Sequence, residues 1–147
     1  MDNSKYGKYI VTELKAPERV MGEYNKLYET FAKRILWLDD DVVPGAFQIN
    51  CSWYCKPQTV ATGEAFAHVH ECDEIIGFFG PHHEDRYNLG AEIEFWIEDE
   101  PHIITKSALI FIPRGIKHCP LILKRVDEPI FHFSVVNSGK YAGKRVP

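Results

Sequence analysis

The chain has 147 residues, of which 45% are hydrophobic and 13% aromatic, with a net charge of −4 at pH 7 and a pI near 6. One domain of this size can bury a hydrophobic core, whereas the charge provides no basic surface for nucleic acid or anionic lipid. No apolar run reaches the length of about 18 residues that a membrane-spanning helix needs, so we expect a globular protein that binds neither nucleic acid nor membrane.

The beginning of the chain and its four cysteines bear on its compartment. Residues 1–5 have no apolar segment of the kind found in signal peptides. Cys51 and Cys55 would lie roughly 13 Å apart in a strand, too far to form a disulfide. We therefore expect a reduced, cytoplasmic protein.

The N-terminal third combines several expected elements. Residues 6–14 are rich in aromatic and β-branched residues and predict a strand. After Pro17 the apolar residues follow helical spacing, although residues 35–38 could equally form a strand. The acidic residues 39–41 lack the spaced oxygen ligands of a calcium loop and predict a solvated turn. The helical positions are Met21, Tyr24, Leu27, Tyr28, Phe31 and Ile35.

From residue 46 onward the sequence predicts short strands separated by glycine, proline or acidic residues. This pattern favours a jelly roll or small barrel over an α/β fold. We expect an N-terminal extension packing on the barrel (1–45), the barrel itself (46–137) and a C-terminal tail (138–147). The polar loop 81–90 could cover the barrel mouth. The predicted strands are 46–55, 65–71, 74–79, 91–98, 101–106, 108–112, 117–126 and 129–137.

The first of these strands alternates between polar and apolar residues. Facing inward, its polar side chains would offer hydrogen bonds to a ligand; facing outward, they would form the wet face of an antiparallel sheet. We favour the outward orientation. The polar set comprises Gln48, Asn50, Ser52 and Tyr54.

Three histidines and a glutamate form the candidate metal site. His68 and His70 are two residues apart, so on a strand they share a face, with Cα atoms roughly 6.5–7 Å apart. Glu74 follows a short polar interval, and His118 follows a proline–glycine turn at residues 113–117. Three imidazoles and one carboxylate suit one divalent transition metal, such as Fe, Mn, Ni, Co, Cu or Zn, better than magnesium or calcium.

The segments His68-x-His70-x-x-x-Glu74 and Pro113-x-Gly115-x-x-His118 resemble the two signature motifs of the cupin superfamily. The resemblance covers about half of the chain. It implies an all-β fold, the double-stranded β-helix or jelly-roll barrel, with a divalent metal held by those three histidines and Glu74.

Some turn positions depart from the motifs. Gly63 and Gly80 each lie closer to the ligands than the usual glycines, and Ser107 and Ile122 replace an expected glycine and asparagine. These departures concern turns and not ligands, so they indicate an atypical branch whose substrate cannot be carried over from other members.

Further residues are candidates for the pocket. We predict that it is lined by Asn50, Tyr54, Phe78 and His132. Strand alternation should turn Cys119 away from the metal. Cys72 is expected to be an ordinary half-buried residue, although a redox role is open. His82 and His83 are expected in solvent, and their function is also open.

The leading functional hypothesis is a metal-dependent enzyme that acts on a small organic molecule, as a dioxygenase, decarboxylase, isomerase or lyase. The competing hypothesis is a binding, storage or sensor module that uses the same metal, and a third is an interaction protein that uses only the barrel. The sequence identifies no acid or base that would select a reaction.

A homodimer is implied by the resemblance and by aromatic residues in excess of what a small barrel holds. These residues are Trp37, Trp53, Trp96, Phe78 and Phe79.

Overall fold

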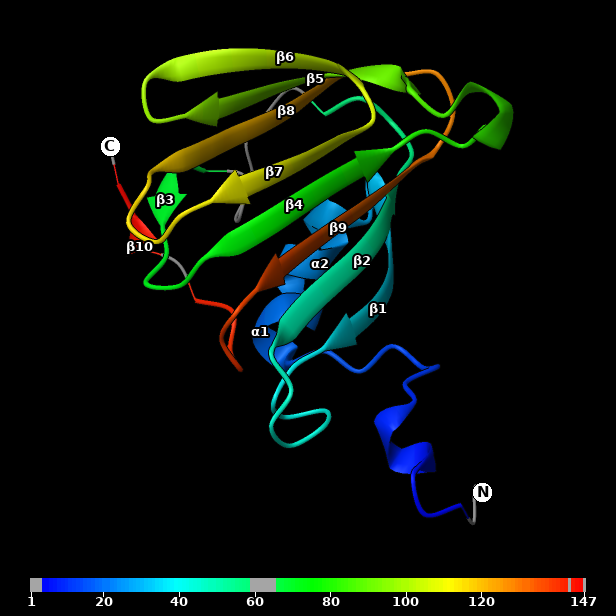
Figure 1. The fold of residues 1–147 in the computed structure, drawn as a ribbon, viewed down its shortest axis with the longest axis vertical. Helices are drawn as coiled ribbons and strands as arrows, with labels where there is room; N and C mark the ends of the chain where they lie inside the picture. The colour runs from blue at the N-terminus through cyan, green and yellow to red at the C-terminus, as the bar shows by residue number, and fades with distance from the viewer. Residues whose placement is uncertain (1–3, 59–65, 143, 147) are drawn as a thin grey trace.

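The computed structural model describes residues 4–58, 66–142 and 144–146. Two five-stranded antiparallel sheets face each other and enclose the core (Figure 1). The first, sheet A, has the order β1-β2-β9-β4-β7, and the second, sheet B, the order β10-β3-β8-β5-β6. This confirms the all-β jelly-roll class. The strands are β1 (Ala32–Leu38), β2 (Gln48–Tyr54), β3 (His68–Val69), β4 (Glu74–Phe79), β5 (Asn88–Ile97), β6 (Glu100–Lys106), β7 (Ala108–Ile112), β8 (His118–Val126), β9 (Ile130–Val136) and β10 (Lys144–Arg145).

Each predicted strand from residue 46 onward overlaps a strand of the structure, although β5 begins at Asn88 and β6 at Glu100, before segments 91–98 and 101–106. Segments 74–79 and 108–112 agree at both ends, whereas segment 65–71 contributes only the short β3. Position 65 and the motif residue Gly63 lie outside the described residues. The loop 81–90 contains the 3-10 helix η3 (His83–Asp85) before β5 begins.

The strand predicted at residues 6–14 is wrong. A 3-10 helix, η1 (Gly7–Tyr9), occupies part of it, and the side chains of Tyr6, Tyr9 and Ile10 are exposed. Residues with high strand propensity form a strand only where a partner strand supplies hydrogen bonds and a packing surface. This segment lies outside both sheets (Figure 1).

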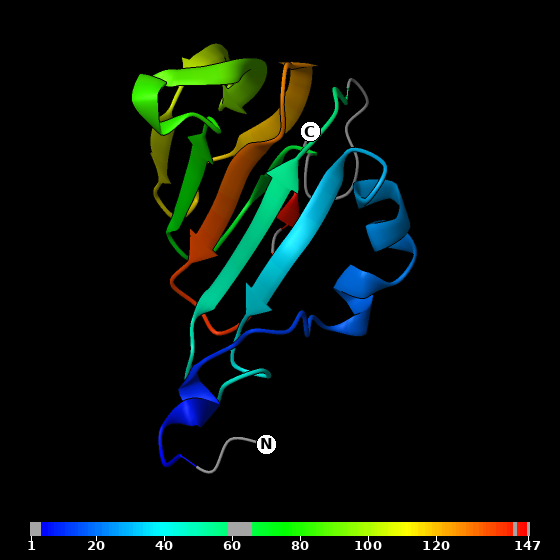
Figure 2. The same cartoon turned by 90° about the vertical axis from the view of Figure 1, so that its right-hand side faces the viewer.

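The predicted amphipathic helix is confirmed only in part, as two short pieces that end at Tyr28, so the predicted positions Phe31 and Ile35 lie outside it. Helix α1 (Glu18–Met21) ends at Gly22, and α2 (Glu23–Tyr28) follows at once. The two helices lie beside β1 (Figure 2). Residues 35–38 belong to β1, the strand alternative for this stretch.

The turn at residues 39–41 is confirmed, but its solvated character is wrong for Asp39. That side chain is fully buried and accepts hydrogen bonds from Trp37 Nε1 at 2.9 Å and from the Asp41 amide at 2.9 Å. The Asp39 carboxylate therefore stabilises the turn by accepting hydrogen bonds from backbone amides that follow it. Because β1 pairs with β2, residues 32–38 of the expected extension are part of sheet A.

The orientation favoured for strand 46–55 is also wrong, since its polar residues face the interior. Tyr28 donates a hydrogen bond to Ser52 at 2.7 Å, Asn50 donates to Ser52 at 3.3 Å, and Arg34 donates to Asn50. These bonds make it possible to bury the polar groups. The inward-facing side chains are Gln48, Asn50, Ser52 and Tyr54.

Two of the five aromatic residues that predicted a dimer are core residues. Trp37 and Phe78 are buried, whereas Trp53 is 40% exposed. Within the described residues, no helix has both the length and the apolar character needed to cross a membrane.

Candidate metal centre

The three histidines and Glu74 come from both sheets and meet in the interior. In sheet B, His68 of β3 lies directly opposite His118, the first residue of β8. His70 follows β3, and Glu74 begins β4 of sheet A. All four side chains are buried. The four residues predicted from the sequence are therefore neighbours in space.

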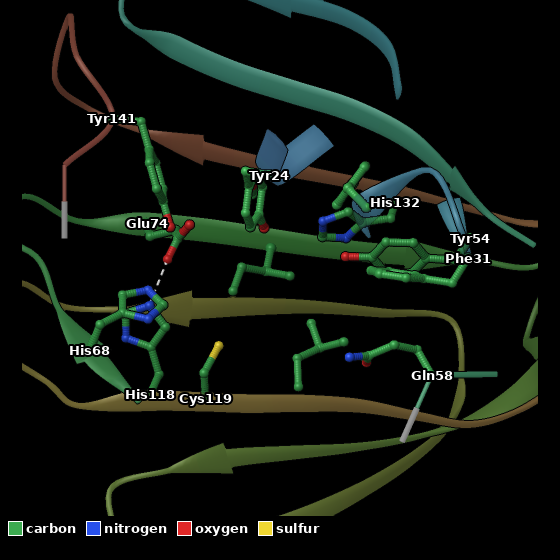
Figure 3. A pocket seen from close by; sticks show the side chains of 14 residues that line it. Tyr24, Phe31, Tyr54, Gln58, His68, Glu74, His118, Cys119, His132 and Tyr141 are labelled. Atoms are coloured by element: carbon green, nitrogen blue, oxygen red, sulfur yellow. Dashed lines mark ion pairs between the residues drawn. The ribbon is translucent and has the colours of Figure 1, made fainter. Parts of the chain in front are cut away.

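The ligand-type atoms of this cluster converge on one point. One nitrogen or oxygen atom from each residue lies within 4.8 Å of the corresponding atom of every other residue. Glu74 Oε1 is 2.9 Å from His118 Nε2 and 3.4 Å from His70 Nε2. Figure 3 shows the Glu74 carboxylate pointing at the imidazoles of His68 and His118.

Backbone carbonyls face the other nitrogen of each ring. The Nδ1 atoms of His68, His70 and His118 lie 2.5, 2.6 and 3.0 Å from the carbonyl oxygens of Phe66, Ala142 and Ile116. A neutral imidazole donates from one nitrogen only, and a carbonyl accepts, so we assign the proton to Nδ1. The lone pair of each Nε2 then points into the cluster, as in histidines that bind metals.

The charges of the cluster follow from its burial. Burial, and after it the neighbouring His118, lower the pKa of His68 to about 4. Burial raises the pKa of Glu74, but when His118 and His70 also carry a proton on Nε2, their hydrogen bonds to the carboxylate outweigh that effect and lower the pKa to about 2. At pH 7 the cluster therefore contains a carboxylate anion beside a neutral His68.

Three acceptor atoms of this cluster have no hydrogen-bond donor facing them in the described part of the chain. The atoms His68 Nε2, His118 Nε2 and Glu74 Oε1 are buried and have no hydrogen-bond partner among the described residues. Several acceptor lone pairs facing one another repel unless a cation lies between them. Three imidazole nitrogens and a carboxylate oxygen are a donor set that suits a divalent transition metal.

The loop between His70 and Glu74 is tied to the turn before His118. Asp73 Oδ1 accepts the amide of Arg114 at 2.9 Å, and the amide of Gly115 donates to the carbonyl of His70 at 2.9 Å. Gly115 has a φ of +81°, which other residues rarely adopt. The two motifs thus hold each other in place.

A cavity of about 60 Å³ adjoins the cluster (Figure 3). Its walls are largely aromatic and aliphatic, and helix α2 and the C-terminal segment both contribute to them. The lining residues are Tyr24, Tyr28, Phe31, Tyr54, Gln58, His68, Glu74, Ile76, His118, Cys119, Leu121, His132, Ser134 and Tyr141.

Of the four residues predicted to line the pocket, two line the cavity and two lie behind its wall. Tyr54 and His132 line the cavity. Phe78 is stacked against His132, with ring centroids 5.1 Å apart, and Asn50 is held by Arg34 and Ser52 in the polar network. Phe78 and Asn50 therefore support the wall without forming it.

His132 is held firmly in place. Its ring is stacked on Tyr54 with centroids 4.5 Å apart, and its Nδ1 lies 3.1 Å from the carbonyl of Gly77. Burial lowers the pKa of His132 to about 4. This histidine is therefore neutral at pH 7.

The expectation that Cys119 points away from the cluster is wrong, because Cys119 lines the same cavity as His118. Its φ is +73°, so the regular alternation of side chains along β8 fails at this residue. No disulfide joins the described cysteines. Burial raises the pKa of Cys72, which disfavours a reactive thiolate.

The two loop histidines are remote from the cavity. The side chain of His83 is fully exposed, and His82 is half-exposed and lies 2.5 Å from Glu128. The Glu128 carboxylate raises the pKa of His82.

Sequence reasoning missed the contributions of Tyr24, Tyr28 and Tyr141. The two helical tyrosines follow the apolar spacing that predicted the helix, and this spacing does not reveal which surface the helix covers. Tyr141 lies in a short segment without periodicity, and its ring is 5.0 Å from that of His70. No local signal identifies it.

Comparisons with known proteins support the fold. No protein-family model matches the sequence, and no curated protein matches it significantly. Peruvianin-I, a cysteine peptidase from Thevetia peruviana latex, matches over 98% of this chain and 80% of its own, with 11% identity and a TM-score of 0.58. Recombinant oxalate oxidase in complex with glycolate matches over 95% and 64%, with 16% identity and a TM-score of 0.55. Another oxalate oxidase, in complex with glycolate as a substrate analogue, matches over 79% and 54%, with 16% identity and a TM-score of 0.50.

These similarities concern the fold alone. The chain spans 54% and 64% of the two oxalate oxidase chains. Together with the two antiparallel sheets, the matches confirm the all-β jelly-roll fold that the sequence predicted.

Proposed function

We propose that the protein is a metal-dependent enzyme that acts on a small organic molecule. One divalent transition metal (Fe, Mn, Ni, Co, Cu or Zn) is held by His68, His70, Glu74 and His118. The observation that carries the proposal is the convergence of buried acceptor atoms, three of which have no hydrogen-bond partner among the described residues. A cation is the group that such a site requires.

The metal would supply Lewis acidity toward a substrate oxygen. The cavity limits the substrate, because about 60 Å³ corresponds to roughly four to six water-sized volumes. Its aromatic walls displace water, and the fixed ring of His132 and the side chains of Tyr141 and Ser134 offer polar contacts that could orient a ligand. Dioxygenase, decarboxylase, isomerase and lyase reactions all fit these features.

A binding, storage or sensor module is the second candidate. It is favoured by the mainly apolar walls, formed by residues such as Phe31, Ile76 and Leu121, and by the neutral state of His132. Turnover of small organic acids and diols by the metal-loaded protein separates the two, because a binding module retains these compounds unchanged.

We also propose that the protein is a cytoplasmic homodimer. The outer face of sheet A carries apolar side chains on four neighbouring strands, with Leu109 66% and Phe111 59% exposed. Exposed apolar surface of this extent is typical of subunit contacts, and a surface without charge can face its own copy about a twofold axis. Free cysteines agree with a reducing compartment.

Metal analysis of wild type and two variants tests the function of the site. We expect about one transition metal per chain in the wild type, and a large loss in His70→Ala, which removes one ligand. His83→Ala is the matched control, because it deletes a fully exposed imidazole. Equal metal content in His70→Ala and wild type would refute the assignment.

A further inference from the structure

We propose that the C-terminal segment, residues 137–142 and 144–146, contributes to metal and ligand binding at the metal centre. In this proposal Ala142 positions His70 for the metal and Tyr141 closes the ligand cavity. The inference rests on the proposed metal site and adds residues that neither motif contains.

Backbone hydrogen bonds fix the segment on both sides of Ala142. Before it, the amides of Gln48 and Asp40 donate to the carbonyls of Ser138 at 2.9 Å and Gly139 at 3.0 Å. After it, β10 pairs with β3, and the amide of Val146 donates to the carbonyl of Ala67 at 3.1 Å.

The beginning of the segment is also tied to the metal-site loop. Asn137 Oδ1 accepts the amide of Asp73 at 2.9 Å, and the amide of Asn137 donates to the carbonyl of Asp73 at 3.2 Å. Asp73 directly precedes Glu74 and accepts the Arg114 amide as well. The segment is thus anchored to the loop that carries the ligands.

His70 depends on this segment in a way that the other two histidines do not. His68 and His118 find their carbonyl partners two residues away, at Phe66 and Ile116. The partner of His70 is Ala142, 72 residues away in the chain. Contacts of this kind fix the tautomer and orientation of a ligand, and their loss typically lowers metal affinity roughly 10–100-fold.

Tyr141 lies beside the metal ligands, where it contacts His70 and lines the cavity. Its ring meets that of His70 edge-on, with an interplanar angle of 63°, and lines the cavity together with Glu74. Figure 3 shows Tyr141 extending from the C-terminal segment toward the Glu74 carboxylate. Tyr141 therefore forms part of the cavity wall next to the ligand-type atoms.

The first experiment compares metal affinity in a chain ending at Asn137 with that in a chain lacking residues 1–9. In the segment that this control removes, the described residues 4–9 lie outside both sheets. Titration with Co²⁺ should show affinity reduced roughly 10–100-fold in the C-terminal truncation and unchanged in the N-terminal one. ¹⁵N NMR of the imidazoles should show that His70, and not His68, loses its fixed tautomer.

Equal Co²⁺ affinity in the two truncations would overturn the inference while leaving the metal site intact. If the full-length chain binds no Co²⁺, the proposed function fails first. The two failures are therefore distinguishable.

A second experiment uses the intact chain, so it does not depend on the folding of a truncated protein. Because coupling is reciprocal, metal binding must stabilise the segment that positions a ligand. We expect Co²⁺ to slow hydrogen exchange of the Val146 amide in wild type and to have no such effect in His70→Ala. Unchanged exchange in the metal-loaded wild type would contradict the coupling.

Azide binding to the Co²⁺-loaded protein tests Tyr141. Tyr141→Ala should admit azide at least several-fold faster than wild type, because the variant opens the wall of the cavity. Tyr9→Ala, which removes an exposed tyrosine, should behave like wild type. Identical azide kinetics in all three proteins would show that Tyr141 does not close the cavity.

Discussion

At the scale of single residues, the site is defined by where protons are located. The three imidazoles face carbonyl oxygens with Nδ1, and the Nε2 atoms of His68 and His118 lie near the Glu74 carboxylate with no hydrogen-bond partner among the described residues. In the metal-free protein this arrangement is unfavourable. The cost of folding an empty site is offset when a cation binds.

Glu74→Gln should therefore have opposite effects on the metal-free and metal-loaded protein. The glutamine amide can donate to a histidine Nε2, so the melting temperature in chelator should rise, by an amount equivalent to about 1 kcal/mol. Metal affinity should fall, because the amide is a poor ligand for a divalent cation. Thermal unfolding with and without metal measures both effects. A variant that is less stable in chelator yet binds metal like wild type would contradict this account.

His132 should make the stability of the metal-free protein depend on pH. Burial lowers its pKa from the ordinary value of 6.5 to about 4, so the unfolded chain binds more protons between these values. Stability therefore falls as pH decreases from about 6.5 to 4. His68 acts in the same direction.

Urea unfolding at several pH values measures this effect of His132. His132→Phe can keep the stacking between Tyr54 and Phe78, and it removes one titrating group, so its stability should change less over this range. A variant with the same pH slope as wild type would rule out the role of His132.

From the sequence, reasoning about single residues identified the four candidate metal ligands, because two short motifs contain all of them. It failed for Cys119, where a positive φ changes the direction of the side chain. It could not identify Tyr141 or Ala142, because their contacts with His70 join parts of the chain that are far apart in sequence.

At the scale of elements, the loop 71–73 and the turn 113–115 act as one unit. Asp73 links them by accepting the Arg114 amide, and it also contacts Asn137. Through its carboxylate and its backbone, this one residue connects the two motifs and the C-terminal segment.

Asp73→Ala should destabilise the protein by about 1 kcal/mol and weaken metal binding, since the turn before His118 loses its anchor. Asp73→Asn is the matched control: it retains an oxygen at the Oδ1 position and should bind metal nearly as well as wild type. Calorimetric metal titration of both variants measures the difference. The idea is excluded if both variants bind metal with wild-type affinity.

The strands were predictable where a short, largely apolar run ends at turn residues, as in β4 and β7. The stretch 6–14 has the composition of a strand but pairs with no strand of either sheet. The inward orientation of β2 was not predictable either, because its polar side chains are satisfied by Tyr28 and Arg34 from other elements. The local sequence pattern therefore predicted where the strands lie, whereas tertiary contacts determine which face of each strand points to the core.

At the scale of the whole molecule, the outer face of sheet A is the most conspicuous surface. Residues opposite one another in the ladders, such as Ile75 with Phe111 and Gly77 with Phe133, bring apolar side chains together across β2, β9, β4 and β7. An added Cβ at Gly77 would overlap the ring of Phe133, which covers this glycine. A surface of this kind favours association.

We expect a dimer in sedimentation experiments, and the double variant Leu109→Lys/Phe111→Glu should be monomeric. Charges at these positions would be buried at a contact between copies at a cost of several kcal/mol. Tyr87→Glu, at an exposed position outside this face, should remain dimeric. A wild type that stays monomeric at high concentration would exclude the dimer.

The fold class followed from the sequence because the motifs and the strand spacing agree. The contacts of the C-terminal segment with His70 could not be predicted, since residues 138–142 have neither periodicity nor a motif and their partners lie far away in the sequence.

Anomalous X-ray diffraction from crystals of the metal-loaded protein tests the central claim most directly. We predict a single strong peak at the metal absorption edge, roughly 2.0–2.3 Å from the Nε2 atoms of His68, His70 and His118 and from a carboxylate oxygen of Glu74. A map with no peak among these four side chains, or with the metal bound only elsewhere, such as between His82 and Glu128, would contradict the account.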